Sequence, residues 1–328
     1  MIISGVTTTT FSFPRSSWSA PVPACLVELR TDNGLTGTAV GPSDIGASID
    51  KTVRDVLSGA DPRTVVMLWQ EMAASDADPR AIAALDVALW DVRAKMNDEP
   101  LWKTLGGIRP CANSFAADCD SMPAIGGFHE GELRLSEDLD DDIRRLGVMA
   151  EMLSAGHRAP VLMLDAEGRW TANEAIEHIG RIENEFDVTW VAVPVPMSDV
   201  HGLKQVSENI AAAVCAGGKL HSASEFLPYF QTMAMDVVQL DISNTGITGA
   251  LQIADTAYGL ELPVTLCASP GNMAAHVAAV IPNFMSLEVA DARSANGIIS
   301  SDVRIEDGRA IAGDMPGNGL TVDPGAVG

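Results

Sequence analysis

Long hydrophobic runs are missing from this chain. Hydrophobic residues make up 47% of its 328 residues, yet no apolar run approaches the roughly 20 residues that a membrane-spanning helix needs. The segment at residues 1–13 also lacks the basic stretch and the long apolar core of a secretory signal peptide. We therefore expect a cytoplasmic protein with an ample core of its own.

Cysteines are few, and their spacing excludes the common cysteine-based sites. The chain has five, odd in number and scattered, with no CxxC pair and no metal-type spacing. They are Cys25, Cys111, Cys119, Cys215 and Cys267. This distribution fits thiols that stay reduced in the cytosol rather than a disulfide framework.

Basic residues are scarce. Lys and Arg number 21 against 44 Asp and Glu, which gives a formal charge of −23. Nucleic acids and anionic membranes are bound through basic surfaces, so we expect neither as a partner. We interpret the charge mainly as an aid to solubility. The densest acidic run, residues 137–142, lies where a helix should begin, and acids there interact favourably with the helix dipole. We therefore predict a solvated first turn rather than a metal cluster.

The first hundred residues predict a mixed α and β unit. Residues 24–30 and 35–40 have the composition of strands, and the segment 31–34 between them has turn chemistry. A helix is predicted over residues 79–96, because Asp78 can cap it, a proline suits its first position and apolar residues recur every three or four positions.

Short apolar runs alternate with amphipathic helical patterns from residue 111 onward. The runs cover residues 113–117, 131–135, 161–165, 188–194, 211–217, 236–241, 263–267 and 285–289. Strands alternating with helices predict a parallel sheet closed into a barrel. The short link at residues 119–130 leaves too little chain for a usual crossover, so the first barrel helix is expected to be missing. The predicted division is a capping domain at residues 1–110, a barrel at 111–302, and a tail at 303–328 that completes the capping domain.

The carboxyl ends of barrel strands converge on one mouth, where acids on successive strands can build a metal site. The third run ends in Asp165. The fourth and fifth runs reach the matching places with Ala192 and Gly218, which carry no side-chain oxygen. One acid of three is therefore present.

Several motifs together resemble the enolase superfamily, in its mandelate racemase and muconate-lactonizing branch. They are the run ALDVALWDV at residues 84–92, the PLW and LGG segments at 100–102 and 105–107, the DAEGRW segment at 165–170 and the PGNGL segment at 316–320. The resemblance covers most of the chain. It implies an α/β fold, with an α+β capping domain over a modified TIM barrel of the (β/α)7β type, and members that commonly form homo-oligomers.

The resemblance also implies site residues, position by position. The second barrel strand of the family usually carries Lys-x-Lys, and here Glu132 and Arg134 stand at those two positions. Asp165 matches the first metal ligand, while Ala192 and Gly218 replace the second and third.

The remaining catalytic positions lie on later strands. Asp241 matches the Asp of a base dyad, Cys267 stands where its His would be, and Glu288 matches an electrophilic Glu. The family reaction removes a proton α to a carboxylate, and its enediolate is tolerable because a divalent cation and a Lys lie on its oxygens.

Two functional hypotheses follow from these substitutions. In the first, the chain is a divergent racemase, epimerase or dehydratase that acts on a small carboxylate-bearing hydroxy or amino acid, with no cofactor or only weakly bound Mg²⁺. It would use Asp241, Cys267, Glu288, Glu132 and Arg134. In the second, it is a degenerate barrel that serves in binding or assembly without turnover.

Two local alternatives stay open at the mouth. Cys267 either carries protons beside Asp241, after a nearby cation tunes its thiol, or fills the space of the lost imidazole. The acids either form a different cation site, from Glu132, Asp165, Glu167 and Asp241, or Glu132 and Arg134 neutralise each other and tie Asp165 into an ion-pair network.

Further candidates lie around the mouth. Arg15 and Trp18 belong to the stretch where the family's capping loop touches substrate, and Lys219 follows the replaced position at Gly218. We treat these three as candidate substrate-binding residues. His276 lies in a helical pattern and is interpreted as structural.

Overall fold

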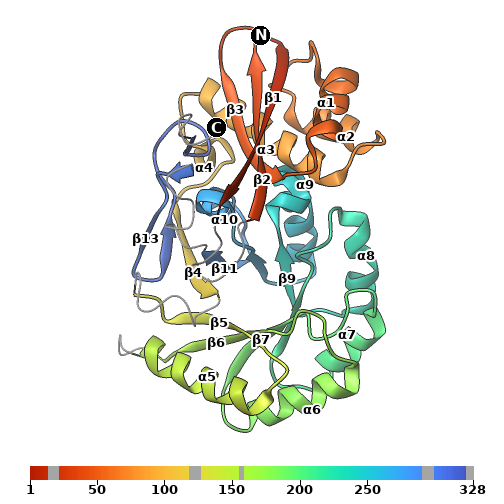
Figure 1. Cartoon of the computed structure of the whole chain (residues 1–328), viewed down its shortest axis with the longest axis vertical. Coiled ribbons are helices and arrows are strands. Elements are labelled where there is room, and N and C mark those ends of the chain that lie inside the picture. The colour runs from red at the N-terminus through yellow and green to blue at the C-terminus, as the bar shows by residue number, and fades with distance from the viewer. Residues whose placement is uncertain (14–21, 118–126, 155–158, 290–298, 323–328) are drawn as a thin grey trace.

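The computed structural model describes residues 1–13, 22–117, 127–154, 159–289 and 299–322. An antiparallel sheet with flanking helices lies at one end of the molecule, and a parallel barrel forms the other end (Figure 1). This arrangement confirms the predicted fold class. Among the described helices, none combines the length and the apolar composition that crossing a membrane would require.

The capping sheet has the order β1 (Ile3–Phe13), β2 (Val22–Thr31), β3 (Thr36–Pro42), with antiparallel neighbours. The predicted hairpin between the last two strands is confirmed. Its turn places Gly34 at φ +88°, a backbone conformation that glycine adopts at little cost. The helical elements that follow are α1 (Gly46–Thr52), the π-helix η1 (Val53–Leu57), α2 (Val65–Ala73), α3 (Pro79–Met96) and α4 (Leu101–Thr104).

Helix α3 has the predicted bounds. The Asp78 side chain accepts a hydrogen bond from the backbone N–H of Arg80, and a proline occupies the first turn. Most of the helix is buried, because it packs against β3 on one side and against a barrel helix, α9 (Ile242–Gly259), on the other. The capping unit is therefore fixed to the barrel through this helix.

The barrel contains eight parallel strands among the described residues. They are β4 (Cys111–Ala117), β5 (Glu130–Arg134), β6 (Val161–Asp165), β7 (Val188–Ala192), β8 (Ala213–Ala216), β9 (Val237–Leu240), β10 (Val264–Leu266) and β11 (Phe284–Val289). Each strand pairs with the next, and β11 pairs with β4 to close the barrel. Each of the eight predicted runs overlaps one of these strands, with ends that differ by up to two residues.

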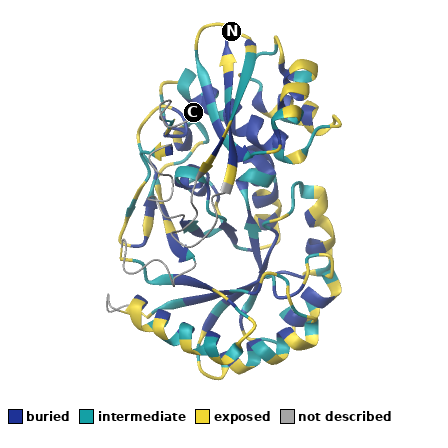
Figure 2. Ribbon diagram, in the orientation of Figure 1, coloured by how far each residue is buried: buried dark blue, intermediate teal, exposed yellow. Residues whose placement is uncertain are grey.

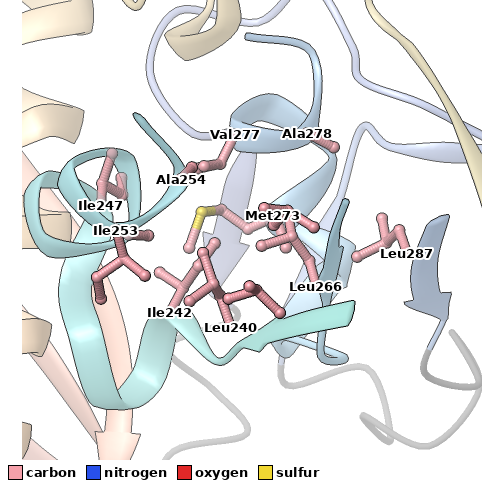
Figure 3. Close-up of a cluster of buried hydrophobic side chains, with 14 of the residues drawn as sticks. Leu240, Ile242, Ile247, Ile253, Ala254, Leu266, Met273, Val277, Ala278 and Leu287 are labelled. Atoms are coloured by element: carbon pink, nitrogen blue, oxygen red, sulfur yellow. The ribbon is translucent and has the colours of Figure 1, made fainter. Parts of the chain in front are cut away.

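Helices cover the outside of the barrel. The remaining ones are α5 (Leu139–Leu153), α6 (Ala172–Glu183), α7 (Val200–Ser207), α8 (Ala223–Thr232), the 3-10 helix η3 (Pro270–Asn272) and α10 (Ala274–Ala278). Figure 2 shows that α5 to α8 turn exposed faces outward. Apolar side chains of β9, β10, β11, α9 and α10, with Met273 directly before α10, belong to one buried cluster (Figure 3). The predicted loss of the first barrel helix falls mostly on residues 118–126, outside the described residues.

The acidic run before α5 is only partly solvated. Asp138 caps the helix by accepting hydrogen bonds from the N–H groups of Asp140 and Asp141, as predicted for a first turn. Asp142, however, is 2% exposed, accepts from Ser136 N and pairs with Arg145 at 2.9 Å. The prediction of a wholly solvated run is wrong at this position, because the carboxylate has strong local partners.

The tail joins the two ends of the molecule. Its strands are β13 (Arg304–Glu306), β14 (Arg309–Ile311) and β15 (Leu320–Val322), and β12 (Ile299–Ser301) lies directly before it. Strand β14 pairs antiparallel with β4, and β12 pairs with β15. The buried Asp91 carboxylate accepts from Asn318 N and Thr38 N, both at 2.7 Å, which ties the tail to the capping sheet. The domain division at residues 110 and 302 stays a prediction.

Candidate active site

The inner face of β5 carries a row of charged side chains. Glu130, Glu132 and Arg134 alternate along this strand, so they share the face that looks into the barrel. In the sheet register Arg134 lies opposite Asp165, and Asp165 lies opposite Ala192. These residues lie at the same height at the carboxyl ends of neighbouring strands, which is where barrel enzymes have their active sites.

Glu132 lies one level deeper and is 7% exposed. The indole Nε1 of Trp190 donates a hydrogen bond to its Oε1 at 3.0 Å, and Trp190 packs edge-to-face on Phe115 with ring centroids 5.6 Å apart. Burial and the nearby Glu288 raise the pKa of Glu132 to about 8, against the opposing effects of the Trp190 hydrogen bond and Arg134. A neutral carboxyl group is therefore the prevailing form near pH 7.

Arg134 pairs with the acids of the next strand. Its Nε is 3.8 Å from Asp165 Oδ2 and 3.4 Å from Glu167 Oε1, and its side chain is 48% exposed. Asp165 also accepts a hydrogen bond from Glu167 N at 2.9 Å. Burial raises the pKa of Asp165, while that hydrogen bond and Arg134 lower it. The expected link between Arg134 and Asp165 is confirmed.

The expected pairing of Glu132 with Arg134 is wrong. No ion pair within 4.0 Å joins these two described residues, and Glu132 takes its hydrogen bond from Trp190 instead. The reason is depth: Glu132 faces the barrel interior, whereas Arg134 extends outward to the more exposed acids.

Ala192 and Gly218 lie at tightly packed positions. Ala192 is 2% exposed and belongs to the interior cluster with Met163, Trp190 and Cys215. A Cβ at Gly218 would lie 2.8 Å from Gln239 Oε1 and 3.2 Å from Cys267 Sγ. Neighbouring side chains therefore occupy the space that a larger side chain would need at either position.

The side chains described around Asp165 do not fit the family's Mg²⁺ site. Mg²⁺ prefers several oxygen ligands in octahedral geometry, and here one carboxylate stands beside a guanidinium. Among the described residues, no three or more His, Cys, Asp or Glu side chains form a group that could hold a metal. This finding also contradicts the alternative cation site of Glu132, Asp165, Glu167 and Asp241. Whether the chain binds Mg²⁺ weakly stays a prediction.

The predicted residues of the later strands also lie at the mouth. Asp241 caps α9: its Oδ1 accepts from Ser243 N at 2.8 Å and Ser243 Oγ at 2.6 Å, and its Oδ2 accepts from Asn244 Nδ2 at 3.4 Å. Glu288 Oε2 accepts from Ala268 N at 3.1 Å. These contacts orient both carboxyl groups.

Cys267 is surrounded by acids rather than by a cation. Burial raises the pKa of its thiol well above its ordinary value, and Asp241 and Glu288 raise it further. Of the two alternatives for Cys267, the one in which a nearby cation tunes its thiol towards neutrality is therefore contradicted. The thiol stays protonated near pH 7.

The remaining candidates divide into three cases. Lys219 is exposed one residue beyond Gly218, and its charge acts on Asp165. Arg15 and Trp18 lie outside the described residues. His276 is buried and accepts from Trp102 N through Nδ1 at 3.3 Å, which agrees with a structural role.

Three side chains at the mouth were not predicted. Trp190 binds Glu132, Gln239 lies against Gly218, and Asn244 Nδ2 donates to Gly218 O at 2.8 Å. Trp190 lies two residues before Ala192 on the same strand, so strand alternation was a signal that could have placed it on the inner face.

Comparison with protein families gives two matches that together cover most of the chain. Residues 17–106 match the N-terminal domain of mandelate racemase and muconate lactonizing enzyme, and residues 115–326 match the enolase C-terminal domain-like family.

Individual relatives are similar at moderate identity. A 3,6-anhydro-α-L-galactonate cycloisomerase of Streptomyces coelicolor is 26% identical, over 90% of this chain and 88% of the relative. An L-talarate/galactarate dehydratase of Salmonella typhimurium is 27% identical, over 92% and 81%. A solved enolase of Bradyrhizobium, in complex with magnesium and mandelic acid, is 25% identical, with a TM-score of 0.89 over 99% of this chain and 97% of that one.

Proposed function

Because the chain belongs to the mandelate racemase and muconate lactonizing enzyme family, we propose that its barrel mouth removes the proton α to the carboxylate of a small hydroxy or amino acid. The overall reaction is then a racemisation or epimerisation, or the loss of water. In the family, Mg²⁺ would offset the charge of the enediolate. Here we propose that Arg134 supplies that positive charge, with little or no dependence on a metal.

The observation that carries this proposal is the place of Arg134. Its guanidinium is 3.8 Å from Asp165, the acid that matches a metal ligand, and its side chain is 48% exposed. A guanidinium is always charged and binds carboxylates through two N–H donors. It therefore offers a fixed cation at the mouth, at the level where the substrate carboxylate would gain charge.

Asp241 is proposed as the base. The hydrogen bonds from Ser243 and Asn244 hold its carboxylate in place at the start of α9. In the proposed step, Asp241 takes the α-proton, the C–H electron pair moves into the carboxylate, and the new negative charge develops beside Arg134. Return of a proton to the opposite face gives the racemised or epimerised acid, whereas departure of a β-hydroxyl, which takes the proton held by Asp241 and leaves as water, gives the dehydrated one.

The relatives support the substrate class. The cycloisomerase and the dehydratase named above are called after acid sugars, and the Bradyrhizobium structure holds mandelic acid. All of these compounds are small hydroxy carboxylates. The homo-oligomer that the resemblance implies stays a prediction.

The test is α-proton exchange in D₂O, followed by proton NMR across a panel of acid sugars, mandelate and amino-acid derivatives. We expect exchange in EDTA-treated protein, and a loss of about 10²- to 10⁴-fold in Asp241→Asn, the range typical for a general base. Arg134→Gln should lose activity comparably. Arg144→Gln, at an exposed arginine of α5, is the matched control and should retain it.

Two outcomes would contradict the proposal. Exchange that requires added Mg²⁺, together with micromolar Mg²⁺ binding that disappears in Asp165→Ala, would show an ordinary metal site. Saturable binding of an acid without exchange by any member of the panel would favour a binding protein. The ion pairs of Arg134 with two acids are the observation that favours this second candidate, because they partly neutralise the cation.

A further inference from the structure

We propose that the carboxyl group of Glu132 donates a hydrogen bond to the substrate carboxylate and forms the inner half of an anion site whose outer half is Arg134. This inference rests on the proposed function, because it concerns how the same mouth holds a carboxylate. It assigns to Glu132 a donor role at a position where the family usually has a lysine.

The geometry leaves one oxygen of Glu132 available. Oε1 accepts from Trp190 Nε1 at 3.0 Å, and indole is a donor only. Among the described residues, no hydrogen bond reaches Oε2. Since Trp190 is itself packed edge-to-face on Phe115, the carboxyl group is held in one orientation with Oε2 free to carry the proton.

The position of Glu132 suits an inner contact. It precedes Arg134 by two residues on the same strand face, and it is 7% exposed. Two donors at successive levels of one strand can therefore reach the two oxygens of one carboxylate, the deeper one through O–H and the outer one through guanidinium N–H.

The surrounding charges explain why the proton stays on Glu132. The charged groups that act on it come from three strands: Glu288 of β11, Asp165 of β6 and Arg134 of β5. Glu132 acts in turn on the thiols of Cys215 on β8 and Cys267 after β10. Burial and the two acids raise its pKa to about 8, against the lowering effects of the Trp190 hydrogen bond and of Arg134. Carboxyl groups that are kept neutral in this way are effective hydrogen-bond donors to an oxyanion.

A neutral Glu132 also removes the charge conflict at this mouth. An ionised carboxylate at this depth would repel an incoming carboxylate, whereas the protonated form attracts it. Binding should therefore weaken about tenfold for each pH unit above the pKa of Glu132, because the proton must return before the anion can bind.

The experiment uses the full chain in EDTA, with mandelate and galactarate as probes, titrated calorimetrically from pH 6 to pH 10. The wild type should bind below pH 8 and weaken above it. Glu132→Gln, which keeps an N–H donor but cannot ionise, should bind within about threefold of the wild type at pH 7 and keep that affinity to pH 10. Glu132→Leu should lose at least about tenfold.

Glu130→Gln is the matched control. Glu130 lies two residues deeper on the same face and accepts from Ser286 Oγ at 2.8 Å, so its variant should keep the wild-type pH profile. A ligand-free readout accompanies the titrations: infrared difference spectra should show a protonated carboxyl band near pH 7 that disappears in Glu132→Gln.

The outcomes separate this inference from the proposed function. Three results would overturn the inference even if proton exchange is found. They are a wild-type affinity that does not depend on pH, no binding of either acid at pH 6, and an ionised Glu132 at pH 7. Affinity with the expected pH dependence but without exchange supports the inference and counts against turnover.

Discussion

Ala192 and Gly218 differ from the carboxylates of a metal site in size as well as in charge. Ala192 is packed with Met163 and Trp190 inside the barrel. The Gln239 amide lies where a side chain at Gly218 would begin, with Oε1 2.8 Å from that Cβ position. The mouth is therefore packed closely around the two small residues, and placing acids there without other changes would create a steric conflict.

We predict that Ala192→Glu with Gly218→Glu does not restore Mg²⁺ binding, because Gln239 and Arg134 still occupy the space. Adding Gln239→Ala and Arg134→Ala should produce binding that calorimetry detects, at least about tenfold tighter than in the double variant. Binding by the double variant alone, with an affinity equal to that of the quadruple variant, would show that neither Gln239 nor Arg134 blocks the site.

The sequence was sufficient for some of these residues and not for others. The ends of the strands could be read from apolar runs, so Asp165, Ala192 and Gly218 were placed at matching positions. The environment of Cys267 could not be predicted, because it depends on Asp241, directly after β9, and Glu288 of β11, which approach only in the closed barrel. Whether the Glu132 carboxyl group contacts Arg134 or Trp190 also depends on how deep its side chain lies in the barrel. Strand alternation does not specify that depth.

The element that connects β7 to the next helix carries unusual backbone geometry. Val193, directly after Ala192, has φ +44°, which is costly for a β-branched residue. Its N–H donates to Cys215 O at 2.8 Å, and its carbonyl accepts from Gly168 N at 2.6 Å. These hydrogen bonds connect the carboxyl ends of β6, β7 and β8 through Val193, so this strained residue stabilises the edge of the mouth.

We predict that Val193→Gly is more stable than Val193→Ala by about 1 kcal/mol, because both remove the side chain but only glycine adopts this φ freely. Urea unfolding measures the difference. At Thr189, within the preceding strand β7, the order should reverse, because glycine weakens a regular strand. An alanine variant at position 193 as stable as the glycine variant would show that the backbone is not strained.

Whole elements were predicted best where local chemistry determines their ends. Helix α3 has the predicted bounds because a capping aspartate and a first-turn proline mark its start. Strands such as β8 are shorter than their apolar runs, since residues beyond the ladder pack without pairing. Apolar composition indicates which residues are buried. Where a strand ends depends instead on backbone pairing with the neighbouring strand, which composition does not show.

At the scale of the whole molecule, buried polar groups connect the capping unit, the barrel and the tail. Asp86 of α3 accepts from Thr248 N and Thr248 Oγ1 of α9, at 2.8 and 2.6 Å. Gly246 has φ +68° beside it, and a Cβ there would lie 2.7 Å from Asp86 Oδ2. His276 of α10 binds the backbone of α4, and its Nε2 faces Gly319 of the tail. Since these contacts cross between elements distant in sequence, ionisation of one group affects the whole assembly.

His276 therefore makes the assembly sensitive to acid. Burial lowers its pKa to about 4, from 6.5 for an ordinary histidine. A depressed histidine pKa contributes stability above about pH 6.5, and that stability is lost as the pH falls towards 4, because the unfolded chain binds the proton more readily. Between pH 7 and pH 5 the loss should be about 2 kcal/mol.

The measurement is the free energy of unfolding in urea at pH 7 and pH 5. His276→Asn keeps an acceptor for Trp102 N and has no titrating ring, so its loss between the two pH values should be smaller than that of the wild type by about 2 kcal/mol. His201→Asn, at an exposed histidine of α7, should behave as the wild type does. If the two asparagine variants lose equal stability on acidification, proton uptake at His276 is not what loosens the connection between the barrel and the capping unit.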